Sequence, residues 1–319
     1  MKKLFLKCAL LCLILAGLLF AGGEAYKRTN TYRNLERKDG TESFREMPEQ
    51  IDIAVFGASH GREDFKFPPE GSVMFNFSMS LQMPVYDLRL MREYQDHIRP
   101  GALVVIAVSP IFPFYVQPEK QAEEQRPRYY RVLSPENIPD VDLGLYLRER
   151  LSPLLTEDFS DILAAFLEEE PLEPTIDEGG GHNRITPDGA EARKPNVFEL
   201  QIAYVQDFPE ANPDLTEAYR EMLALCREKG WRAVLAAPPY LEEYTGCFSE
   251  FSPDYFDVQR AYMEGLAREY EAVYLDYSHD PDFAGRHDLY RDMSHMNLEG
   301  AALFNGRFFE DVRALGLLD

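Results

Sequence analysis

From residue 51 onward the sequence alternates short apolar runs with longer segments in which apolar residues recur every three or four positions. The short runs predict five strands, at 51–56, 72–77, 102–108, 231–237 and 272–276. The longer segments predict helices, at 83–98, 214–229, 254–270 and 297–315. Strands separated by helices in this order predict an α/β fold, a three-layer α/β/α sandwich with a mostly parallel five-stranded sheet in flavodoxin-like order.

One long segment, 110–213, interrupts this alternation. It is far longer than the ~2–6 residues that usually connect a strand to a helix, so it is predicted to be an insertion that projects over the carboxyl edge of the sheet. Helices are predicted inside it near 143–155 and 159–169. Its aromatic opening, Ile111 to Tyr115, is predicted to pack against the rest of the insertion and to form one wall of a substrate cleft. The glycine-rich, charged stretch 178–193 is expected to be the most mobile part of the body.

The N-terminal segment 1–23 is apolar after a short basic start. Lys2, Lys3 and Lys7 precede an uncharged run that extends to Gly23, a pattern that directs a chain to the membrane. Residues 4–23 match the ~20 residues that a membrane-spanning helix needs, and no clear cleavage site follows them. An uncleaved signal anchor is therefore favoured, with residues 24–50 as a polar stalk and residues 51–319 as the folded body outside the cytoplasm. Secretion after signal cleavage is the alternative.

Composition narrows the class of protein further. Hydrophobic residues make up 45% of the chain and aromatic residues 13%, as is typical of a globular protein. The formal net charge of −22 argues against a nucleic-acid partner, because the phosphates would be repelled. The two cysteines of the body, Cys226 and Cys247, are interpreted as buried thiols in preference to a disulfide.

A single hydroxyl group follows the first predicted strand. Gly57 ends the apolar run, and Ser59 comes two residues later, where the chain must turn toward a helix. The carboxyl edge of the sheet is where open α/β sheets place their chemistry, and backbone N–H groups of such a turn suit a developing oxyanion. Ser59 is therefore a candidate nucleophile. The alternative is a serine that only caps the helix.

The second half of a candidate site lies near the other end of the chain. Asp292 and His295 are three residues apart in a polar stretch that leads into the last predicted helix. In a turn, this spacing lets the carboxylate reach Nδ1 of the imidazole while Nε2 faces outward, which is how a base is held to accept a serine proton. The alternative is that Asp292 caps the helix and His295 is a surface residue. Nearby histidines and acids at 279–288 are interpreted as a solvated loop, so neither a metal nor a cofactor is predicted.

These motifs together resemble the SGNH/GDSL hydrolase superfamily. The resemblance rests on Phe56-Gly57-Ala58-Ser59, on Phe75-Asn76-Phe77-Ser78 and on Asp292-x-x-His295, and it covers about 51–108 and 231–315. Within the superfamily the chain is most similar to membrane-anchored proteins of cell-envelope acylation, the DltD-like and AlgJ-like branch. The resemblance implies Ser59 as nucleophile, His295 as base and Asp292 as its orienting partner.

The sequence departs from the superfamily at the oxyanion hole. Leu81 stands near the position of the usual glycine, and Ser109 lies where the usual asparagine motif is missing. The backbone N–H of the turn at Leu81 can still donate, and Gly57, Asn76 and Ser109 are further oxyanion or substrate-binding candidates. A missing asparagine is typical of the anchored acyl-transfer branch, so the departure favours that branch over a free lipase.

The expected function is that of a membrane-tethered SGNH-type acyl-ester hydrolase or acyltransferase that acts on a cell-envelope polymer through a serine acyl intermediate. An acylated polymer or acyl donor is the expected substrate, and a membrane-bound O-acyltransferase is a candidate partner. Two alternatives stay open. One is a non-catalytic or weakly catalytic assembly partner of such an acyltransferase, and the other is a secreted carbohydrate esterase.

Overall fold

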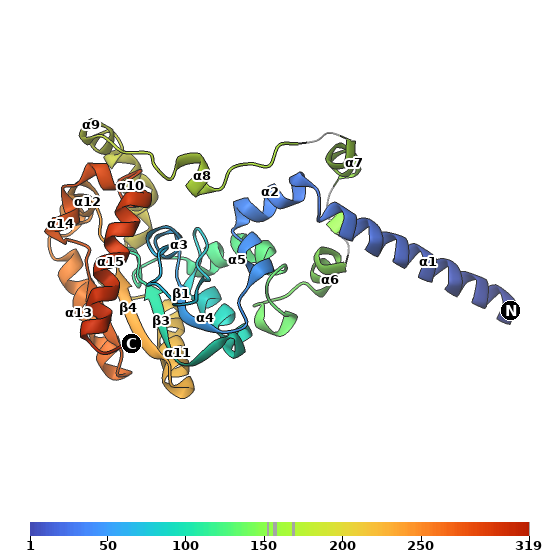
Figure 1. Cartoon of the computed structure of the whole chain (residues 1–319), viewed down its shortest axis with the longest axis horizontal. Helices are drawn as coiled ribbons and strands as arrows, with labels where there is room; N and C mark the ends of the chain where they lie inside the picture. Colours follow the sequence, from blue (N-terminus) through green and yellow to red (C-terminus); the bar gives the residue numbers. More distant parts are fainter. Residues whose placement is uncertain (152, 156–157, 168–169, 319) are drawn as a thin grey trace. The chain divides into compact units, whose positions relative to one another are not determined.

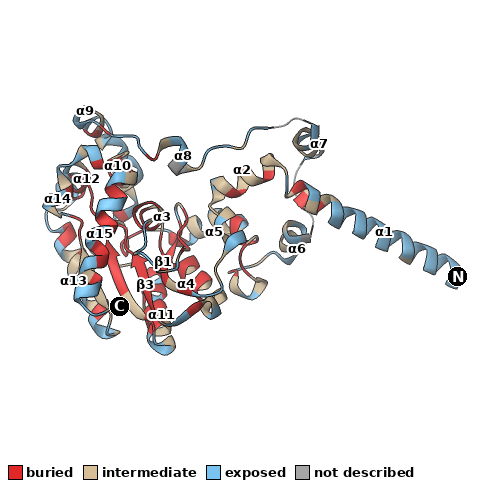
Figure 2. Ribbon diagram, viewed as in Figure 1, coloured by how far each residue is buried: buried red, intermediate tan, exposed pale blue. Residues whose placement is uncertain are grey.

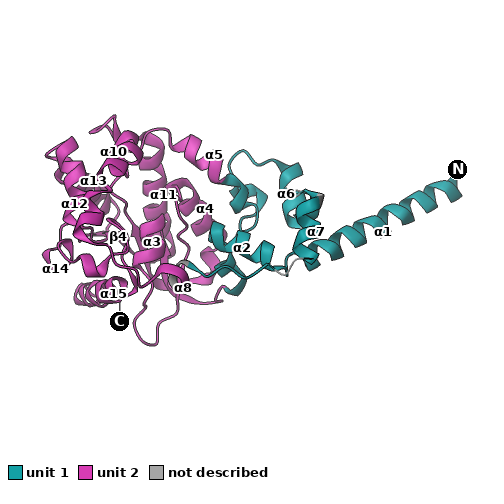
Figure 3. Ribbon diagram, turned by 90° about the horizontal axis from the view of Figure 1, so that it is seen from above, with its two compact units in different colours: residues 1–46, 126–175 teal, residues 47–125, 176–319 magenta. Residues whose placement is uncertain are grey.

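The structure of the protein, a computed structural model, describes residues 1–151, 153–155, 158–167 and 170–318. The chain forms two compact units (Figure 3). Unit 1 consists of Met1–Glu46 and Arg126–Thr175, and unit 2 consists of Met47–Gln125 and Ile176–Asp319. This division cuts across the predicted insertion, because its middle belongs to unit 1 while its two ends belong to the unit that contains the sheet.

Unit 2 is built on a five-stranded parallel sheet with strand order β2-β1-β3-β4-β5. The strands are β1 (Ile51–Phe56), β2 (Met74–Asn76), β3 (Ile98–Ala107), β4 (Arg232–Ala237) and β5 (Val273–Asp276). The C-terminal parts of the three central strands are buried, as Figure 2 shows, and Val55 of β1 pairs with Val105 of β3. Buried, β-branched strands of this kind are typical of parallel sheets that are covered on both faces.

Helices flank this sheet in two layers (Figure 1). On one side, α11 (Pro213–Lys229) contacts α4 (Pro84–Glu93) and α13 (Tyr255–Glu269); elsewhere, α3 (Ser59–Asp64) packs on α15 (Leu298–Ala314) and on β1. The predicted α/β class, sheet and strand order are therefore confirmed. The remaining helices that begin in this unit are α5 (Pro118–Tyr129), α8 (Ile176–Gly180), α9 (Pro187–Glu191), α10 (Lys194–Leu200), α12 (Glu242–Phe251) and α14 (Pro281–Ala284).

The C-terminal part of the predicted insertion is integral to the core of unit 2. Five of its apolar residues are buried there: Ile185, Ala190, Val197, Ile202 and Val205. The backbone N–H of Ile185 also donates to Tyr290 O at 2.8 Å. The stretch 178–193 is thus anchored to the core at Ile185 and Ala190, and removing 119–212 would strip core residues from the sheet unit.

The aromatic opening of the insertion packs against its own segment, as predicted, through Phe114. Phe114 is 1% exposed and its ring contacts Phe208, Tyr255 and Tyr262. Only the first of these partners lies in the predicted insertion; the other two lie on α13. The opening is thus anchored to the sheet unit as well as to its own segment.

Unit 1 contains the N-terminal helix α1 (Lys2–Tyr26), together with α2 (Asn30–Asp39), α6 (Leu143–Leu151) and α7 (Phe159–Leu167). Among the described residues, one helix, α1, is long enough and apolar enough to cross a bilayer. Membrane anchors and signal sequences share this property. Its apolar side chains are exposed along nearly its whole length, as the pale blue helix in Figure 2 shows.

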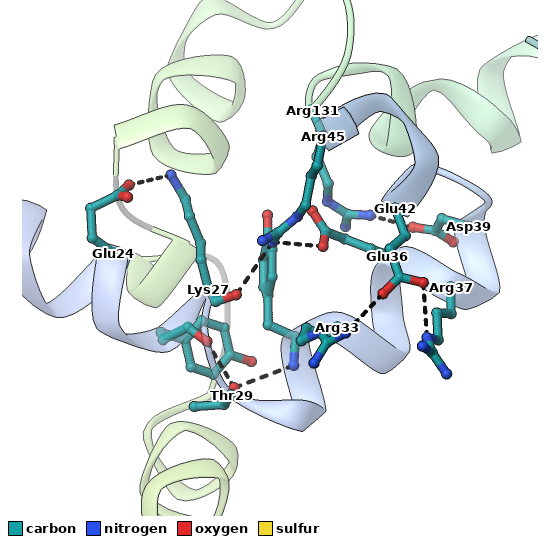
Figure 4. A network of polar contacts seen from close by, with 12 residues as sticks. Glu24, Lys27, Thr29, Arg33, Glu36, Arg37, Asp39, Glu42, Arg45 and Arg131 are labelled. Atoms are coloured by element: carbon teal, nitrogen blue, oxygen red, sulfur yellow. Dashed lines mark hydrogen bonds and ion pairs between the residues drawn. The ribbon is translucent and has the colours of Figure 1, made fainter. Parts of the chain in front are cut away.

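Most of the segment predicted as a stalk, as far as Glu46, is folded within unit 1. Thr29 caps α2 by accepting the N–H of Tyr32, and Gly40 ends the helix in the left-handed conformation. Behind these caps lies a network of ion pairs, including Arg45 with Glu36 and Arg131 with Asp39 (Figure 4). Residue 131 is far away in sequence, so the polar composition of 24–50 alone could not show this partner and indicated a stalk.

Candidate active site

The turn after β1 places Ser59 at the carboxyl edge of the sheet. Gly57 has φ +143°, and a Cβ at this position would lie 2.9 Å from Ala107 O, so a side chain cannot be accommodated without displacing β3. Ala58 is the N-cap residue, and Ser59 is the first residue of α3. The serine is half-buried, and its hydroxyl is displayed at the start of the helix.

A buried polar pair holds this turn from behind. Asp87 of α4 accepts the backbone N–H of Gly57 at 2.8 Å, and Gln82 Nε2 donates to Asp87 at 2.6 Å and to Gly57 O at 3.2 Å. The backbone N–H and the carbonyl oxygen of Gly57 are thereby both hydrogen-bonded. These bonds fix the turn that carries Ser59. Sequence reasoning did not identify Gln82 or Asp87. Asp87 lies among the apolar positions of an amphipathic helix, where a charged residue carries no motif of its own.

The histidine is carried on a closed loop between β5 and α15. Tyr290 and Met296 form an antiparallel bridge at the base of this loop, and the N–H of Asn297 donates to Leu289 O at 3.0 Å. Inside the loop, Asp292 Oδ1 accepts the backbone N–H groups of Ser294 and His295, both at 2.9 Å. The carboxylate is therefore locked by its own turn before it meets the imidazole. Asn297 is the N-cap of α15, so Asp292 is not the helix cap.

The three predicted residues come together in the order that a proton relay needs. His295 Nε2 lies 2.8 Å from Ser59 Oγ, although the two residues are 236 positions apart. His295 Nδ1 lies 3.0 Å from Asp292 Oδ2 and 3.1 Å from Oδ1. In the tautomer with hydrogen on Nδ1, the imidazole donates to Asp292 and accepts the hydroxyl hydrogen of Ser59. The predicted geometry of serine, histidine and aspartate is confirmed.

Helix α3 is tied directly to the histidine loop. Asp64, at the end of α3, accepts the backbone N–H of Met296 at 3.1 Å, and Glu63 forms an ion pair with Arg291. Asn305 of α15 donates to Asp64 O and accepts the backbone N–H groups of residues 66 and 67. Because Ser59 begins the same short helix, these contacts fix the nucleophile relative to its base.

The electrostatics of the pair favour a charged complex of histidine and aspartate. Burial by itself lowers the pKa of His295, but the Asp292 carboxylate and its hydrogen bond outweigh burial and raise this pKa to about 9. Burial likewise acts to raise the pKa of Asp292, but the charge of His295, its hydrogen bond and the two backbone N–H groups hold it well below its ordinary value. Asp292 is thus a permanent carboxylate that stabilises an imidazolium.

Two further titratable groups lie against the imidazole, and sequence reasoning missed both. His60 follows the nucleophile directly, is 5% exposed, and stacks on His295 with ring centroids 4.6 Å apart. Neither of its ring nitrogens has a hydrogen-bond partner among the described residues, and burial, followed by the charge of His295, lowers the pKa of His60 well below its ordinary value. Burial raises the pKa of Asp64 to about 8. Both groups are therefore uncharged at neutral pH.

Two of the predicted oxyanion candidates are already engaged. The Gly57 N–H donates to Asp87, and the side-chain amide of Asn76 donates to Gly61 O at 2.8 Å and to Phe65 O at 2.9 Å. Gly57 and Asn76 are thus wrong as donors to an oxyanion, because their hydrogens are used to build the turn. Ser109 is buried with its carbonyl oxygen accepting from Gln259, and no contact between described residues links its hydroxyl to Ser59.

Leu81 retains the backbone feature that the sequence suggested. It has φ +57° in the turn closed by the hydrogen bond from Gln82 N–H to Met79 O. In the described part of the chain neither its N–H nor the N–H of Ser59 has an acceptor. The Ser59 N–H adjoins the reacting oxygen, so these two groups are the remaining backbone candidates for an oxyanion hole.

The position of the histidine loop depends on a close approach at Gly300. A Cβ at this residue, in the first turn of α15, would lie 2.1 Å from Leu289 O, which already accepts the N–H of Asn297. We expect Gly300→Ala to lower the free energy of unfolding by about 2–4 kcal/mol, because backbone must move. Chemical denaturation measures this loss. Gly306→Ala on the same helix is the matched control, since its Cβ meets nothing within 4 Å; equal stability of the two variants would contradict the prediction.

Among the described residues, no three histidine, cysteine, aspartate or glutamate side chains are arranged to hold a metal ion. Cys226 and Cys247 are free and buried, in agreement with the favoured interpretation of two thiols.

Comparison of the chain with protein-family models finds no match, and comparison with curated proteins finds none either. The geometry of the site is therefore the main basis for a functional proposal.

Proposed function

We propose that the protein is a serine esterase or O-acyltransferase of SGNH type, with Ser59 as nucleophile, His295 as general base and Asp292 as its orienting partner. The observation that carries the proposal is the continuous relay from Asp292 through His295 to Ser59 Oγ, with contacts of 3.0 and 2.8 Å. Its position at the carboxyl edge of a parallel sheet agrees with where such folds place their chemistry.

The relay supports two-step acyl transfer. Ser59 Oγ attacks the ester carbonyl carbon while its proton passes to His295 Nε2, and the negative charge that develops on the carbonyl oxygen faces the N–H of Ser59. His295 then gives the proton to the departing alkoxide, which leaves an acyl group on Ser59. Water or an acceptor hydroxyl, deprotonated by His295, then attacks the acyl carbon, and His295 returns this proton to Ser59 Oγ as the acyl–Oγ bond breaks. Asp292 keeps its charge throughout and stabilises the imidazolium.

The class of substrate is proposed from the N-terminal segment and from the sequence resemblance. A basic start followed by α1 favours a membrane anchor with the body outside the cytoplasm. An anchored enzyme of this kind meets acylated polymers of the cell envelope, or an acyl donor delivered by a membrane-bound O-acyltransferase. The resemblance to the envelope-acylation branch of the SGNH/GDSL superfamily favours the same class of substrate.

Trapping the acyl-enzyme tests this proposal. The full chain in detergent would be treated with an activated acetyl ester and, separately, with a fluorophosphonate, followed by mass spectrometry of the intact protein and its peptides. We expect one adduct per chain, located on Ser59, and no adduct in His295→Ala, because the serine then lacks its base. Adducts spread over exposed serines such as Ser249, or an adduct on Ser59 that does not depend on His295, would refute the relay.

A further inference from the structure

Unit 1 carries an exposed set of large apolar side chains that the proposed chemistry does not use. They lie on α6, on the 3-10 helix η4 (Pro153–Leu155) and on α7. This set, termed the apolar patch, consists of Leu143, Leu147, Leu155, Leu163, Phe166 and Leu167, each between 45% and 74% exposed. Single exposed leucines are ordinary on a protein surface, but a group of this size marks a contact surface.

The side chains of the patch follow helical faces. On α6, Leu143 and Leu147 are four positions apart, and on α7, Leu163 is followed by Phe166 and Leu167 at three and four positions. Each pair or triplet therefore lies on one side of its helix. Asp161, two positions before Leu163, falls on the opposite side of α7 and is exposed. Helix α7 is thus amphipathic, and its apolar side, like the two leucines of α6, stays largely exposed.

The elements that carry the patch all contact the C-terminal end of α1 within the same unit. Phe166 packs against Tyr26 with ring centroids 6.3 Å apart, and a Cβ on Gly22 would lie 2.9 Å from Leu154 Cδ1. Lys27 Nζ donates to Arg150 O at 3.2 Å, so the C-terminal end of α6 lies beside the C-terminal end of α1. The helices α6 and α7 lie beside this end of α1 in Figure 3.

This end of α1 is where a membrane-spanning helix would leave the hydrocarbon. The residues from Leu4 to Gly23 would span about 30 Å at the rise of an α-helix, which matches the hydrocarbon thickness of a bilayer. Glu24, Tyr26 and Lys27 then lie at headgroup level, where tyrosine and charged residues are common. The ion pairs in Figure 4 begin at Glu24 and Lys27, so the polar part of the unit starts at the same depth.

We infer that the apolar patch inserts into the interfacial layer of the membrane that α1 crosses, so that unit 1 rests on the bilayer through α6, η4 and α7 as well as through its anchor. The occupant of the patch is lipid, because the patch continues the apolar surface of α1 at the level of the headgroups. Arg148 and Arg150 on α6 and Asp158 and Asp161 at α7 are exposed, two basic and two acidic residues whose charges cancel. Insertion is therefore driven by apolar area and is independent of lipid charge. The inference rests on the membrane-anchor part of the proposed function and not on the chemistry of Ser59.

Depth-dependent quenching of tryptophan tests this inference. The full chain would be reconstituted in phosphatidylcholine vesicles brominated close to the headgroup, with Leu147→Trp and Leu163→Trp as reporters. The parent protein, whose one tryptophan is the buried Trp231, gives the baseline. We expect both reporters to lose emission, equally in vesicles with and without anionic lipid and equally at high salt. Asp161→Trp, on the polar side of α7, is the matched control and should keep its emission.

A reporter inside the anchor separates the two ways in which this test can fail. Leu13→Trp should be quenched by lipids brominated near the chain ends if α1 crosses the bilayer. Quenching of Leu13→Trp without quenching at residues 147 and 163 would refute the inference and assign the patch to a protein partner. No quenching at residue 13 would show that α1 is not inserted, which would refute the inference together with the anchor. Quenching of Asp161→Trp equal to that of Leu163→Trp would also contradict an oriented insertion.

Discussion

Ser59→Ala should reduce the turnover of an activated acyl ester by a factor on the order of 10⁴–10⁶, to the level that binding and backbone dipoles alone provide. Ser59 Oγ lies 2.8 Å from His295 Nε2, and its removal takes away the nucleophile that this base activates. Steady-state hydrolysis of a chromogenic ester by the full chain in detergent measures the loss. The effect should appear in kcat, because the serine acts on the reacting carbon.

The fold should tolerate this change. Ser59 is half-buried at the start of α3, and the contacts that fix this helix are made by Glu63, Asp64 and their partners. Ser249→Ala, an exposed serine on α12, is the matched control and should keep full activity. A Ser59→Ala protein with the unfolding midpoint of the parent and more than a small fraction of its activity would exclude Ser59 as nucleophile.

The local parts of the site follow from the sequence because their geometry is local. A buried strand that ends in glycine must turn there, and Asp292 reaches His295 because residues three apart in a turn are neighbours. Their meeting with Ser59 required one further step, that parallel strands end at the same edge of a sheet. Each of these steps uses spacing of a few residues or a general property of the fold class.

The supports of the site could not be predicted, because they depend on contacts distant in sequence. Asp64 meets Met296 across 232 residues, and Asp87 meets Gly57 across 30. Asn76 also shows that contacts made in the fold cannot be read from the sequence. An asparagine after a strand can donate to an oxyanion or to backbone carbonyls, and only the fold shows that its hydrogens go to Gly61 and Phe65.

The packing of the segment 110–213 could not be predicted for a related reason. Its buried residues, such as Val197, Ile202 and Val205, are spread over short helices, so they produce no sustained period in the sequence. Helix α12 was missed because Gly246 interrupts a mixed run of acidic and aromatic residues. The start of β3 at Ile98, four residues before the predicted strand, includes Pro100 and Gly101, which a pattern-based reading places in a turn.

Asp292→Asn should have the second large effect, a reduction of kcat/KM on the order of 10⁴-fold, together with a displaced pH profile. In the parent protein His295 must be neutral to act as a base, so activity should rise with pH through the raised pKa of about 9. The amide of the variant lacks the charge that opposes burial, and burial lowers the pKa of the imidazole. The acid limb of kcat/KM should therefore move down by at least about one pH unit.

The charged groups around the imidazole decide how far the limb moves. The Glu63 carboxylate remains in the variant and continues to raise the pKa of His295, and Asp64 does so once it ionises near pH 8, so the displacement should be smaller than complete removal of negative charge would give. Asp288→Asn, an exposed acid at the edge of the same loop that is paired with Arg286, is the matched control and should leave the limb unchanged. If the acid limb of kcat/KM stays at the same pH in Asp292→Asn, a group other than His295 is responsible for that limb.

The same pair links stability to pH with a defined sign. The folded-state pKa of His295 lies above its unfolded value of about 6.5, so its protonation stabilises the fold fully below pH ~6.5 and progressively less as pH rises toward 9. Thermal unfolding of the parent should therefore show a falling midpoint across this window, and Asp292→Asn should flatten that fall. Because the kinetic limb and the stability window report one ionisation, they should move together in the variant, whereas a purely structural role for Asp292 would lower the midpoint uniformly at every pH.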